Sequence, residues 1–330
     1  MVVTASGNVY MFGAYKSVDG AQLRDVAPPD EVRTDKDEIQ RPDQTEDDYL
    51  YRPAPRYKQE FPIHLDMPGK VLQVFCGASF SAALLDDGSV VTWGIGESGE
   101  LGRPTETPIK TGREYNTDAI RDIYLKAQPP IFLDNPTLTR RVLAVGCGSF
   151  HMLLVVQESG TSKRAVYSTG LNNYGQLGLG DIVNRESLTR VEALDDCNID
   201  RLAAGNHHSM CLDASGQHLY TWGRADYGQI GNATTIPNAG AYEPVPVLID
   251  MGVEEIMTQI SCGGNHNLVL TKDGNAHAWG YGDQGALGLG IEEDQYTPRQ
   301  LKLPAGKKFA HVEGGGQHSA FIIVDTSPSK

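Results

Sequence analysis

One short pattern occurs five times in this chain, and it constrains the fold more than any other feature. Each copy has a small residue, a glycine, two variable positions and then an aromatic residue or histidine, followed by an apolar run. The copies are VFCGASFSAAL (74–84), VGCGSFHMLLV (145–155), AAGNHHSMCL (203–212), ISCGGNHNLVL (260–270) and EGGGQHSAFII (313–323). The later copies recur about every 50 to 60 residues, a spacing typical of propeller blades or solenoids.

A second pattern completes the repeating unit. It follows four of the copies as DDGSVVTWGIGESGELGRP, AVYSTGLNNYGQLGLGD, SGQHLYTWGRADYGQIGN and DGNAHAWGYGDQGALGLG, and ASGNVYMFGAYKSVDG stands alone at the N-terminus. The alternation in SVVTW and HLYTW favours strands, and the Asp-Gly and Ser-Gly pairs favour tight turns between them. Such a unit cannot bury both faces alone, whereas copies stacked around an axis can. We therefore predict an all-β propeller.

The domain organisation follows from the spacing of the repeats. We expect one β-propeller domain over residues 1–330, with two insertions. Residues 24–60 form an acidic, proline-containing segment with almost no apolar periodicity, which favours an exposed, flexible insertion. Residues 103–130 separate two blades and are predicted to form a second loop insertion.

Charge and hydropathy exclude several classes of function. The formal net charge is −14, whereas phosphate binding needs clustered Lys and Arg, so we expect no direct sequence-specific binding of nucleic acid. No apolar run approaches the roughly twenty residues that span a bilayer. The start, MVVTASG, also lacks the parts of a secretion signal, so we expect no membrane partner.

No sequence motif supports covalent chemistry. The chain lacks a GxxxxGK[ST] phosphate-binding loop, an HExxH pair and a nucleophile motif. The GLGLG strings follow strands but lead into no helix and recur from blade to blade, so they do not indicate dinucleotide binding. We expect no catalytic residue and no cofactor.

The stretch AAGNHHSMCL invites a metal-site interpretation, because imidazole and thiolate are common zinc ligands. On a strand, however, His207 and His208 point to opposite faces, so one ion cannot easily take both. The five cysteines also show no paired motif, and we expect them to be reduced core residues.

Three stretches give these repeats a specific resemblance. FGAYKSVDG (12–20), GESGELGR (96–103) and GRADYGQIG (223–231) are similar, in this order, to segments of the regulator of chromosome condensation family, whose members exchange nucleotide on the small GTPase Ran. The resemblance implies a seven-bladed propeller of which one face binds Ran. It also implies that FGAYKSVDG projects as a β-wedge that presses near the phosphate-binding loop of the GTPase and loosens nucleotide and magnesium.

The resemblance assigns roles to individual residues. The residues that would form the wedge are Tyr15, Lys16, Ser17, Val18 and Asp19. Arg103, His207 and His318 fall where the family has Ran-contacting residues, although His318 also occupies the repeat-core position shared with His208. The family implies a nuclear, chromatin-associated protein active in nucleocytoplasmic transport and mitosis, with a cytoplasmic location as the alternative. A nucleosome-binding loop would lie near Lys110 and Arg113, with histones as a further partner.

The sequence departs from the family in two places. Ser79 stands where the family has a functional aspartate, and Phe80 replaces the repeat histidine. The chain also begins in mid-blade, so it is similar to the later two-thirds of a propeller. We expect an incomplete seven-bladed ring in preference to a closed ring of about five blades.

Two other interpretations of function stay open. The chain could be a non-catalytic repeat propeller that serves as a protein-interaction scaffold. It could also belong with the plant ultraviolet sensors of the superfamily, although these use clusters of tryptophan and this chain has only Trp93, Trp222 and Trp279.

Overall fold

The computed structural model describes residues 1–13, 59–105, 110–111, 114–115, 126–134, 139–232, 238–252 and 255–326. These ranges fold almost entirely as strands and turns, with two short 3-10 helices, η4 (Glu192–Leu194) and η5 (Asp283–Gly285). No helix within them is long and apolar enough to span a membrane.

Three blades are complete four-stranded antiparallel sheets, with the strands paired in chain order. From the axis outward, their strands are β9 (Arg140–Cys147), β10 (His151–Glu158), β11 (Arg164–Gly170) and β12 (Arg185–Arg190); β13 (Ile199–Ala204), β14 (His208–Asp213), β15 (Leu219–Arg224) and β16 (Tyr242–Ile249); and β17 (Met257–Cys262), β18 (His266–Thr271), β19 (Ala276–Gly280) and β20 (Gln295–Gln300). Each blade is therefore one copy of the repeat seen in the sequence.

Three further sheets have fewer strands. They comprise β1 (Val2–Val3), β2 (Val9–Gly13) and β3 (Gln59–Leu65); β4 (Val71–Cys76), β5 (Phe80–Leu85) and β6 (Val90–Gly94); and the hairpin of β21 (Lys307–Gly314) and β22 (Ser319–Asp325). An antiparallel bridge between Thr92 and Gln128 supplies the outer position beside β6. The segment 103–130 thus rejoins the blade before its end, and it carries a small hairpin of β7 (Lys110–Thr111) and β8 (Glu114–Tyr115).

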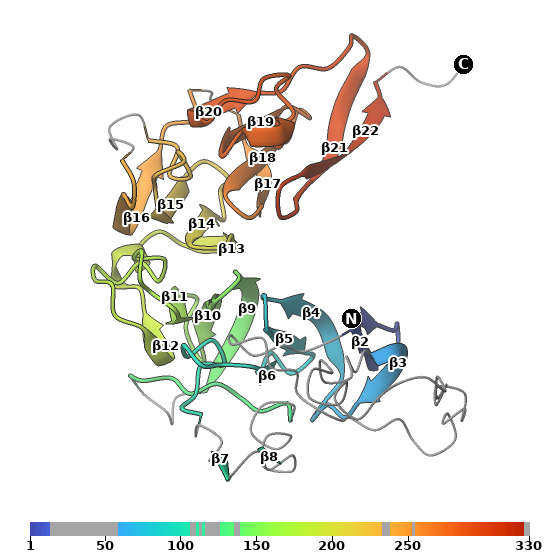
Figure 1. The fold of residues 1–330 in the computed structure, drawn as a ribbon, viewed down its shortest axis with the longest axis vertical. Helices are drawn as coiled ribbons and strands as arrows, with labels where there is room; N and C mark the ends of the chain where they lie inside the picture. The colour runs from blue at the N-terminus through green and yellow to red at the C-terminus, as the bar shows by residue number, and fades with distance from the viewer. Residues whose placement is uncertain are drawn as a thin grey trace, which may run out of the picture.

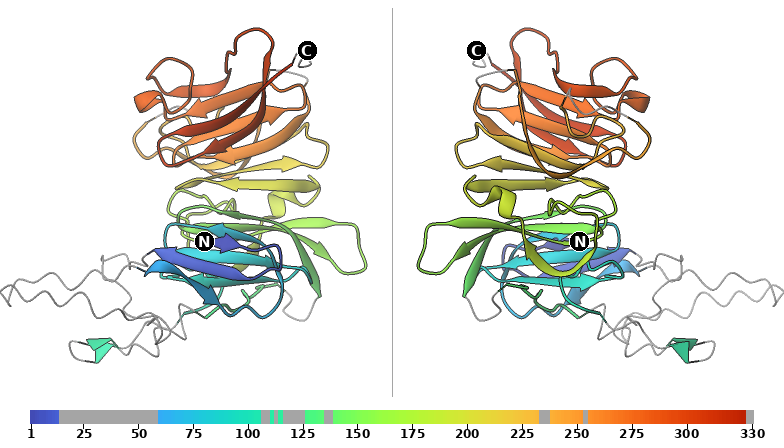
Figure 2. Two further views of the ribbon diagram at one scale, coloured as in Figure 1. Left: turned by 90° about the vertical axis from the view of Figure 1, so that its right-hand side faces the viewer. Right: turned by 90° about the vertical axis from the view of Figure 1, so that its left-hand side faces the viewer.

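The six sheets follow one another around a common axis and form an open arc (Figure 1). Side views show the blades as successive layers from the N-terminal to the C-terminal end of the chain (Figure 2). Among the described residues, no strand pairing joins β1–β3 to β21–β22, and the arc is open between them. The prediction of an all-β propeller with an incomplete ring is therefore confirmed.

The inner strands surround a central cavity of about 560 Å³. Cys76, Cys147 and Cys262 line it at equivalent places on β4, β9 and β17. The expectation that these cysteines are core residues was wrong for Cys76, which is exposed. It was only partly right for Cys147 and Cys262, which are half-buried. Among the described residues, no further sheet covers the axial side of the inner strands.

Glycine-rich loops fill the space between neighbouring blades. One apolar residue at the equivalent place of each loop, directly before a glycine, is buried, namely Leu101, Leu177, Ile230 and Leu287. Gly178 and Gly231 have φ of +75° and +76°, and a Cβ on either would lie within 3 Å of the indole nitrogen of Trp222 or Trp279. Only glycine fits both the left-handed backbone and this contact with the tryptophan of the next blade.

Candidate partner-binding face

One end of the propeller gathers two sets of connections. In a complete blade, the Gly-x-x-His turn leads into the second strand and the glycine-rich loop leaves the third strand. Register pairs His208 with Gly223, and His266 with Gly280, so these connections lie together at one end. We call this end, with its turns and loops, the turn face.

Backbone hydrogen bonds link the turns from blade to blade. The Ala78 amide donates to the Ser149 carbonyl at 3.0 Å, and the Ser149 amide donates to the Gly205 carbonyl at 3.1 Å. The series continues from Asn206 to Gly264 at 2.8 Å and from Gly264 to Gly316 at 3.1 Å. Because each bond crosses a blade junction, the turn face is a continuous surface over these blades.

The repeat histidines connect blades in the interior. His151 Nε2 lies 2.8 Å from Ser209 Oγ, His208 Nε2 lies 3.0 Å from Asn267 Oδ1, and His266 Nε2 lies 3.0 Å from Ser319 Oγ, each partner being in the next blade. Burial lowers the pKa of His151 to about 3 and the pKa values of His208 and His266 to about 4. These imidazoles are therefore neutral, structural groups at physiological pH.

His207 lies one residue before this buried position, on the turn face itself. Its ring centroid is 5.2 Å from that of Tyr174 and 6.0 Å from that of Phe150, both contributed by the preceding blade. Burial, and secondarily the positive charge of Arg224, lowers its pKa. Its Nδ1 is buried without a hydrogen-bond partner among the described residues, so His207 is a neutral imidazole packed against two aromatic rings.

Arg224 extends this aromatic group into the next loop. Its guanidinium carbon lies 5.0 Å from the ring centroid of Tyr174 and 4.9 Å from that of Tyr227. Two hydrogen bonds of 2.8 Å, from Nε and Nη2, join it to the carboxylate of Asp226. This bidentate pair, held between two aromatic rings, fixes the position of the cation.

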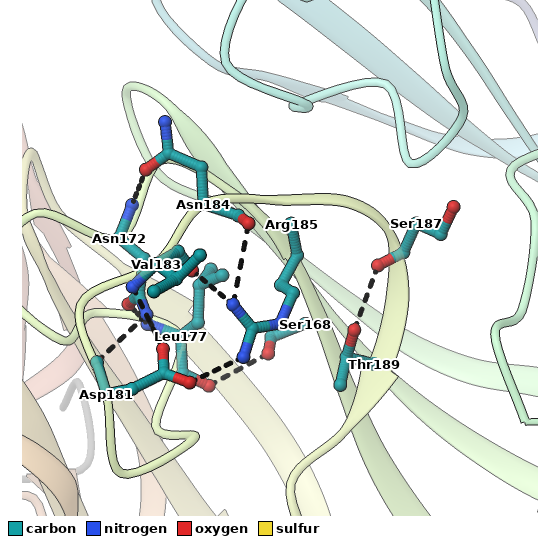
Figure 3. Close-up of polar contacts among 9 residues, drawn as sticks. All are labelled: Ser168, Asn172, Leu177, Asp181, Val183, Asn184, Arg185, Ser187 and Thr189. Atoms are coloured by element: carbon teal, nitrogen blue, oxygen red, sulfur yellow. Dashed lines mark hydrogen bonds and ion pairs between the residues drawn. The ribbon is translucent and has the colours of Figure 1, made fainter.

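The loop that carries Tyr174 is held by a polar network (Figure 3). Asp181 accepts hydrogen bonds from the Arg185 guanidinium at 2.5 Å, the Val183 amide at 2.9 Å and the Asn172 side chain at 3.0 Å. The Asn172 side chain also accepts from the Leu177 backbone amide, and the Asn172 backbone amide donates to Asn184 Oδ1. These bonds fix both ends of the loop, so the position of Tyr174 is defined without a partner.

Arg103 does not extend into solvent from the turn face. It is only 7% exposed, and its guanidinium donates to Thr92 Oγ1 at 2.5 Å, to the Gln128 carbonyl at 3.1 Å and to the Thr92 carbonyl at 3.2 Å. Burial lowers its pKa to about 10. In this structure Arg103 joins β6 to the returning segment at Gln128, a structural contact that the resemblance did not indicate.

Of the other residues predicted to bind a partner, only some lie in the part of the chain that the structure describes. His318 is exposed at the last turn, where its carbonyl accepts from the Gly315 amide at 2.8 Å. The wedge residues Tyr15, Lys16, Ser17, Val18 and Asp19, together with Arg113, lie outside the described residues. Lys110 is described only as part of the backbone of β7.

The stretch AAGNHHSMCL does not form a metal site among the described residues. His208 and Cys211 are fully buried in β14, whereas His207 lies in the turn. Within the described ranges, no group of three or more His, Cys, Asp or Glu side chains could hold a metal ion. The arrangement suits recognition of another protein surface by aromatic and charged side chains.

Four residues of the turn face were not predicted from the sequence: Tyr174, Arg224, Asp226 and Tyr227. Three of these, Arg224, Asp226 and Tyr227, lie in GRADYGQIG, where an arginine and an aspartate two residues apart at the end of a strand were a usable signal. Their packing against Tyr174 was not visible in the sequence, because Tyr174 belongs to the previous blade.

The successive blades and their aromatic turn face define the class of this protein as a repeat propeller. Residues 1–321 match the RCC1-like domain, so the chain belongs to this family. The resemblance to the regulator of chromosome condensation family is thereby confirmed at the level of the family.

Individual relatives place the chain within this family. It is 28% identical over 284 residues to the mouse protein "Regulator of chromosome condensation", covering 83% of this chain and 63% of the relative. It is 32% identical over 186 residues to the Arabidopsis thaliana "Ultraviolet-B receptor UVR8", covering 56% of this chain and 40% of the relative. The chain thus spans less than two thirds of the length of either relative.

A solved structure shows the same fold. Prp20p from Saccharomyces cerevisiae, described together with its binding to Gsp1p and histones, superposes with a TM-score of 0.73 at 22% sequence identity. The match covers 98% of this chain and 66% of the yeast chain. The similarity supports the propeller arrangement of the blades.

Proposed function

We propose that this chain is a guanine-nucleotide exchange factor for the small GTPase Ran. The observation that carries the proposal is the His207 site: a neutral imidazole on the turn face, packed against Phe150 and Tyr174 and near the fixed cation of Arg224. Membership of the RCC1-like domain family and similarity to the mouse regulator of chromosome condensation support this choice of activity.

Exchange of this kind requires no acid, base or nucleophile from the factor. A factor that binds the nucleotide-free GTPase more tightly than the loaded form must weaken nucleotide binding by the same ratio, because the two equilibria are linked. The turn face would supply this differential binding. The wedge at residues 15–19 would act near the phosphates and magnesium, and the more abundant nucleotide would then set the direction of exchange.

The cellular context belongs to the same proposal. A Ran exchange factor of this family would act in the nucleus on chromatin, where Lys110 and Arg113 would face a nucleosome and histones would be a further partner. Arg113→Ala should then weaken nucleosome binding in a mobility-shift assay while leaving nucleotide release unchanged. Equal nucleosome binding by the parent and the variant would remove this role for the loop.

The first test of exchange is the release of a fluorescent guanine nucleotide from Ran. The chain should accelerate release above the intrinsic rate, and His207→Ala should reduce that acceleration by roughly tenfold, as expected for loss of a central interface contact of 1–2 kcal/mol. His64→Ala is the matched control, because His64 is an exposed histidine on β3 whose ring packs against Tyr10.

The outcome separates exchange from scaffolding. If the chain gives a cooperative unfolding transition but release stays at the intrinsic rate, exchange by this chain is ruled out. A scaffold is the second candidate, favoured by the similarity to an ultraviolet-B receptor within the same family. A scaffold would bind partners through the turn face without changing nucleotide release.

A further inference from the structure

The blade of β17–β20 repeats the Arg224 arrangement with one change. Arg224 comes directly after Gly223 and is the last residue of β15, the third strand of its blade, and its amide donates to the His207 carbonyl at 2.9 Å. Tyr281 occupies the equivalent place in the next blade, where its amide donates to the Asn265 carbonyl at 2.9 Å. The next junction therefore has a tyrosine where the previous one has the arginine.

The partners of these two residues also correspond. Arg224 packs on Tyr174 of the preceding blade and pairs with Asp226, two residues further along. Tyr281 packs on Tyr227 of the preceding blade, with ring centroids 5.1 Å apart, and its hydroxyl donates to Asp283 at 2.8 Å. Both junctions thus have an aromatic ring and a carboxylate. Arg224 also lies against Tyr227, but its ion pair is with Asp226 of the first junction and not with Asp283 of the second.

The second junction carries excess negative charge. Asp294 Oδ1 accepts from the Gly282 amide at 2.9 Å, and the carboxylates of Asp283 and Asp294 contribute to a raised pKa at Tyr281. Tyr296 is 38% exposed and lies near Asp294, and burial and then the charge of Asp294 raise its pKa. Among the described residues, Asp283 and Asp294 form no ion pair with Lys or Arg.

We propose that Tyr227, Tyr281, Tyr296, Asp283 and Asp294 form a cation-accepting site on the turn face, which binds lysine or arginine side chains from a basic segment of a partner protein. The neighbouring junction shows the same kind of contact within this chain, because the Arg224 guanidinium lies between two tyrosine rings and pairs with an aspartate. At the second junction a partner would supply the cation. The exposed Glu292 and Glu293 lie next in the chain and extend the acidic surface for neighbouring basic residues.

Fluorescence anisotropy with a labelled decapeptide of alternating lysine and serine tests this site. The parent chain should bind this peptide and should not bind the same peptide with glutamate in place of lysine. Tyr281→Arg should weaken binding at least about fivefold, because the new arginine would fill the site in the manner of Arg224. Glu186→Gln is the matched control: it makes the same +1 change in charge at an exposed position on β12, and its affinity should stay within about twofold of the parent.

Other results would overturn the site. Equal weakening by Tyr281→Arg and Glu186→Gln would mean general attraction to an acidic chain, and no binding by the parent would mean no site. If Tyr281→Arg unfolds, Asp283→Asn combined with Asp294→Asn provides the second variant, and unchanged affinity in that variant would exclude the site. The inference is independent of exchange: His207→Ala should leave peptide binding intact, and peptide binding can fail while nucleotide release is still accelerated.

Discussion

Glu100 is a buried carboxyl group in a position that two other blades fill with a glutamine amide. Its Oε2 accepts from the Ser98 amide at 2.8 Å, as Gln176 Oε1 accepts from the Tyr174 amide and Gln229 Oε1 from the Tyr227 amide at 2.9 Å. Burial, assisted by the negative charge of Glu97, raises the pKa of Glu100 to about 7. A protonated, neutral Glu100 therefore resembles the glutamine side chains of the other two blades. An ionised Glu100 has no counterpart in those blades.

Glu100→Gln should stabilise the fold more as pH rises. The Glu100 side chain ionises near its ordinary pKa of 4.5 in the unfolded chain and near 7 in the folded chain. The contribution of protonated Glu100 to the free energy of unfolding is therefore fully present below pH 4.5 and is lost as pH rises through 7. The shift corresponds to at most about 3 kcal/mol. We expect the gain at pH 8 to exceed the gain at pH 5 by about 1–2 kcal/mol in urea unfolding.

Gln176→Glu is the reciprocal control for this residue, because it places a carboxyl at the equivalent position of another blade. It should lose stability over the same range of pH. A gain in Glu100→Gln that does not vary with pH would show that packing, and not ionisation, separates the two side chains.

At the scale of the element, the contact between second strands takes two chemically different forms. In three junctions a repeat histidine contacts a polar side chain in the next blade, as His151 contacts Ser209. Where Phe80 replaces the histidine, the residue at the partner position is Met152, and both lie in one apolar cluster. Both positions are apolar in this junction and both are polar in the other three, so each junction has a matched pair.

Replacing His151 and Ser209 together by Phe and Met should convert one form of junction into the other. The His151 imidazole has a folded-state pKa of about 3 against an ordinary 6.5, so its stabilising contribution is complete above pH 6.5 and is lost as pH falls toward 3. At pH 4 the free energy of unfolding is lower by about 3 kcal/mol from this residue. The double variant should unfold near the parent's urea midpoint at pH 7.5 and resist acid better at pH 5.

Single substitutions define the coupling within this pair. Ser209→Met alone leaves the buried His151 Nε2 without its partner, which should cost about 1–3 kcal/mol. The double variant should recover at least about 1 kcal/mol of that cost. Phe80→His with Met152→Ser is the reverse exchange and should add sensitivity to acid. Additive single effects, or acid sensitivity unchanged by either exchange, would contradict the matched-pair account.

Features of the fold that depend on residues within one repeat could be predicted from the sequence, whereas contacts between neighbouring repeats could not. The strands, the positive-φ glycines and the buried leucines follow from patterns inside each copy, so the propeller was predictable. The matched pairs join residues 58, 59 and 53 positions apart, and the contact of Arg224 with Tyr174 also crosses a junction. Arg103 was placed on the partner-binding face by resemblance, but a buried space between Thr92 and Gln128 accommodates its guanidinium.

At the scale of the whole molecule, the open arc leaves β22 with one described partner strand. In the complete blades the second strands β10, β14 and β18 are buried almost throughout, whereas β22 pairs with β21 alone. Its apolar residues are accordingly exposed, with Ile322 at 57%, Ile323 at 44% and Val324 at 36%. An exposed apolar edge of this kind is a template for pairing with another strand.

We therefore expect this chain to self-associate through β22, and Ile322→Lys combined with Val324→Lys should suppress the association, because two charges on one face of an edge strand oppose pairing. Sedimentation velocity over a range of protein concentrations measures the effect as a change in the concentration dependence of the sedimentation coefficient. Leu133→Lys is the control, since Leu133 is 65% exposed but lies outside the named strands. If the double variant associates as the parent does, the edge of β22 is not the contact; if Leu133→Lys suppresses association equally, charge alone accounts for the effect.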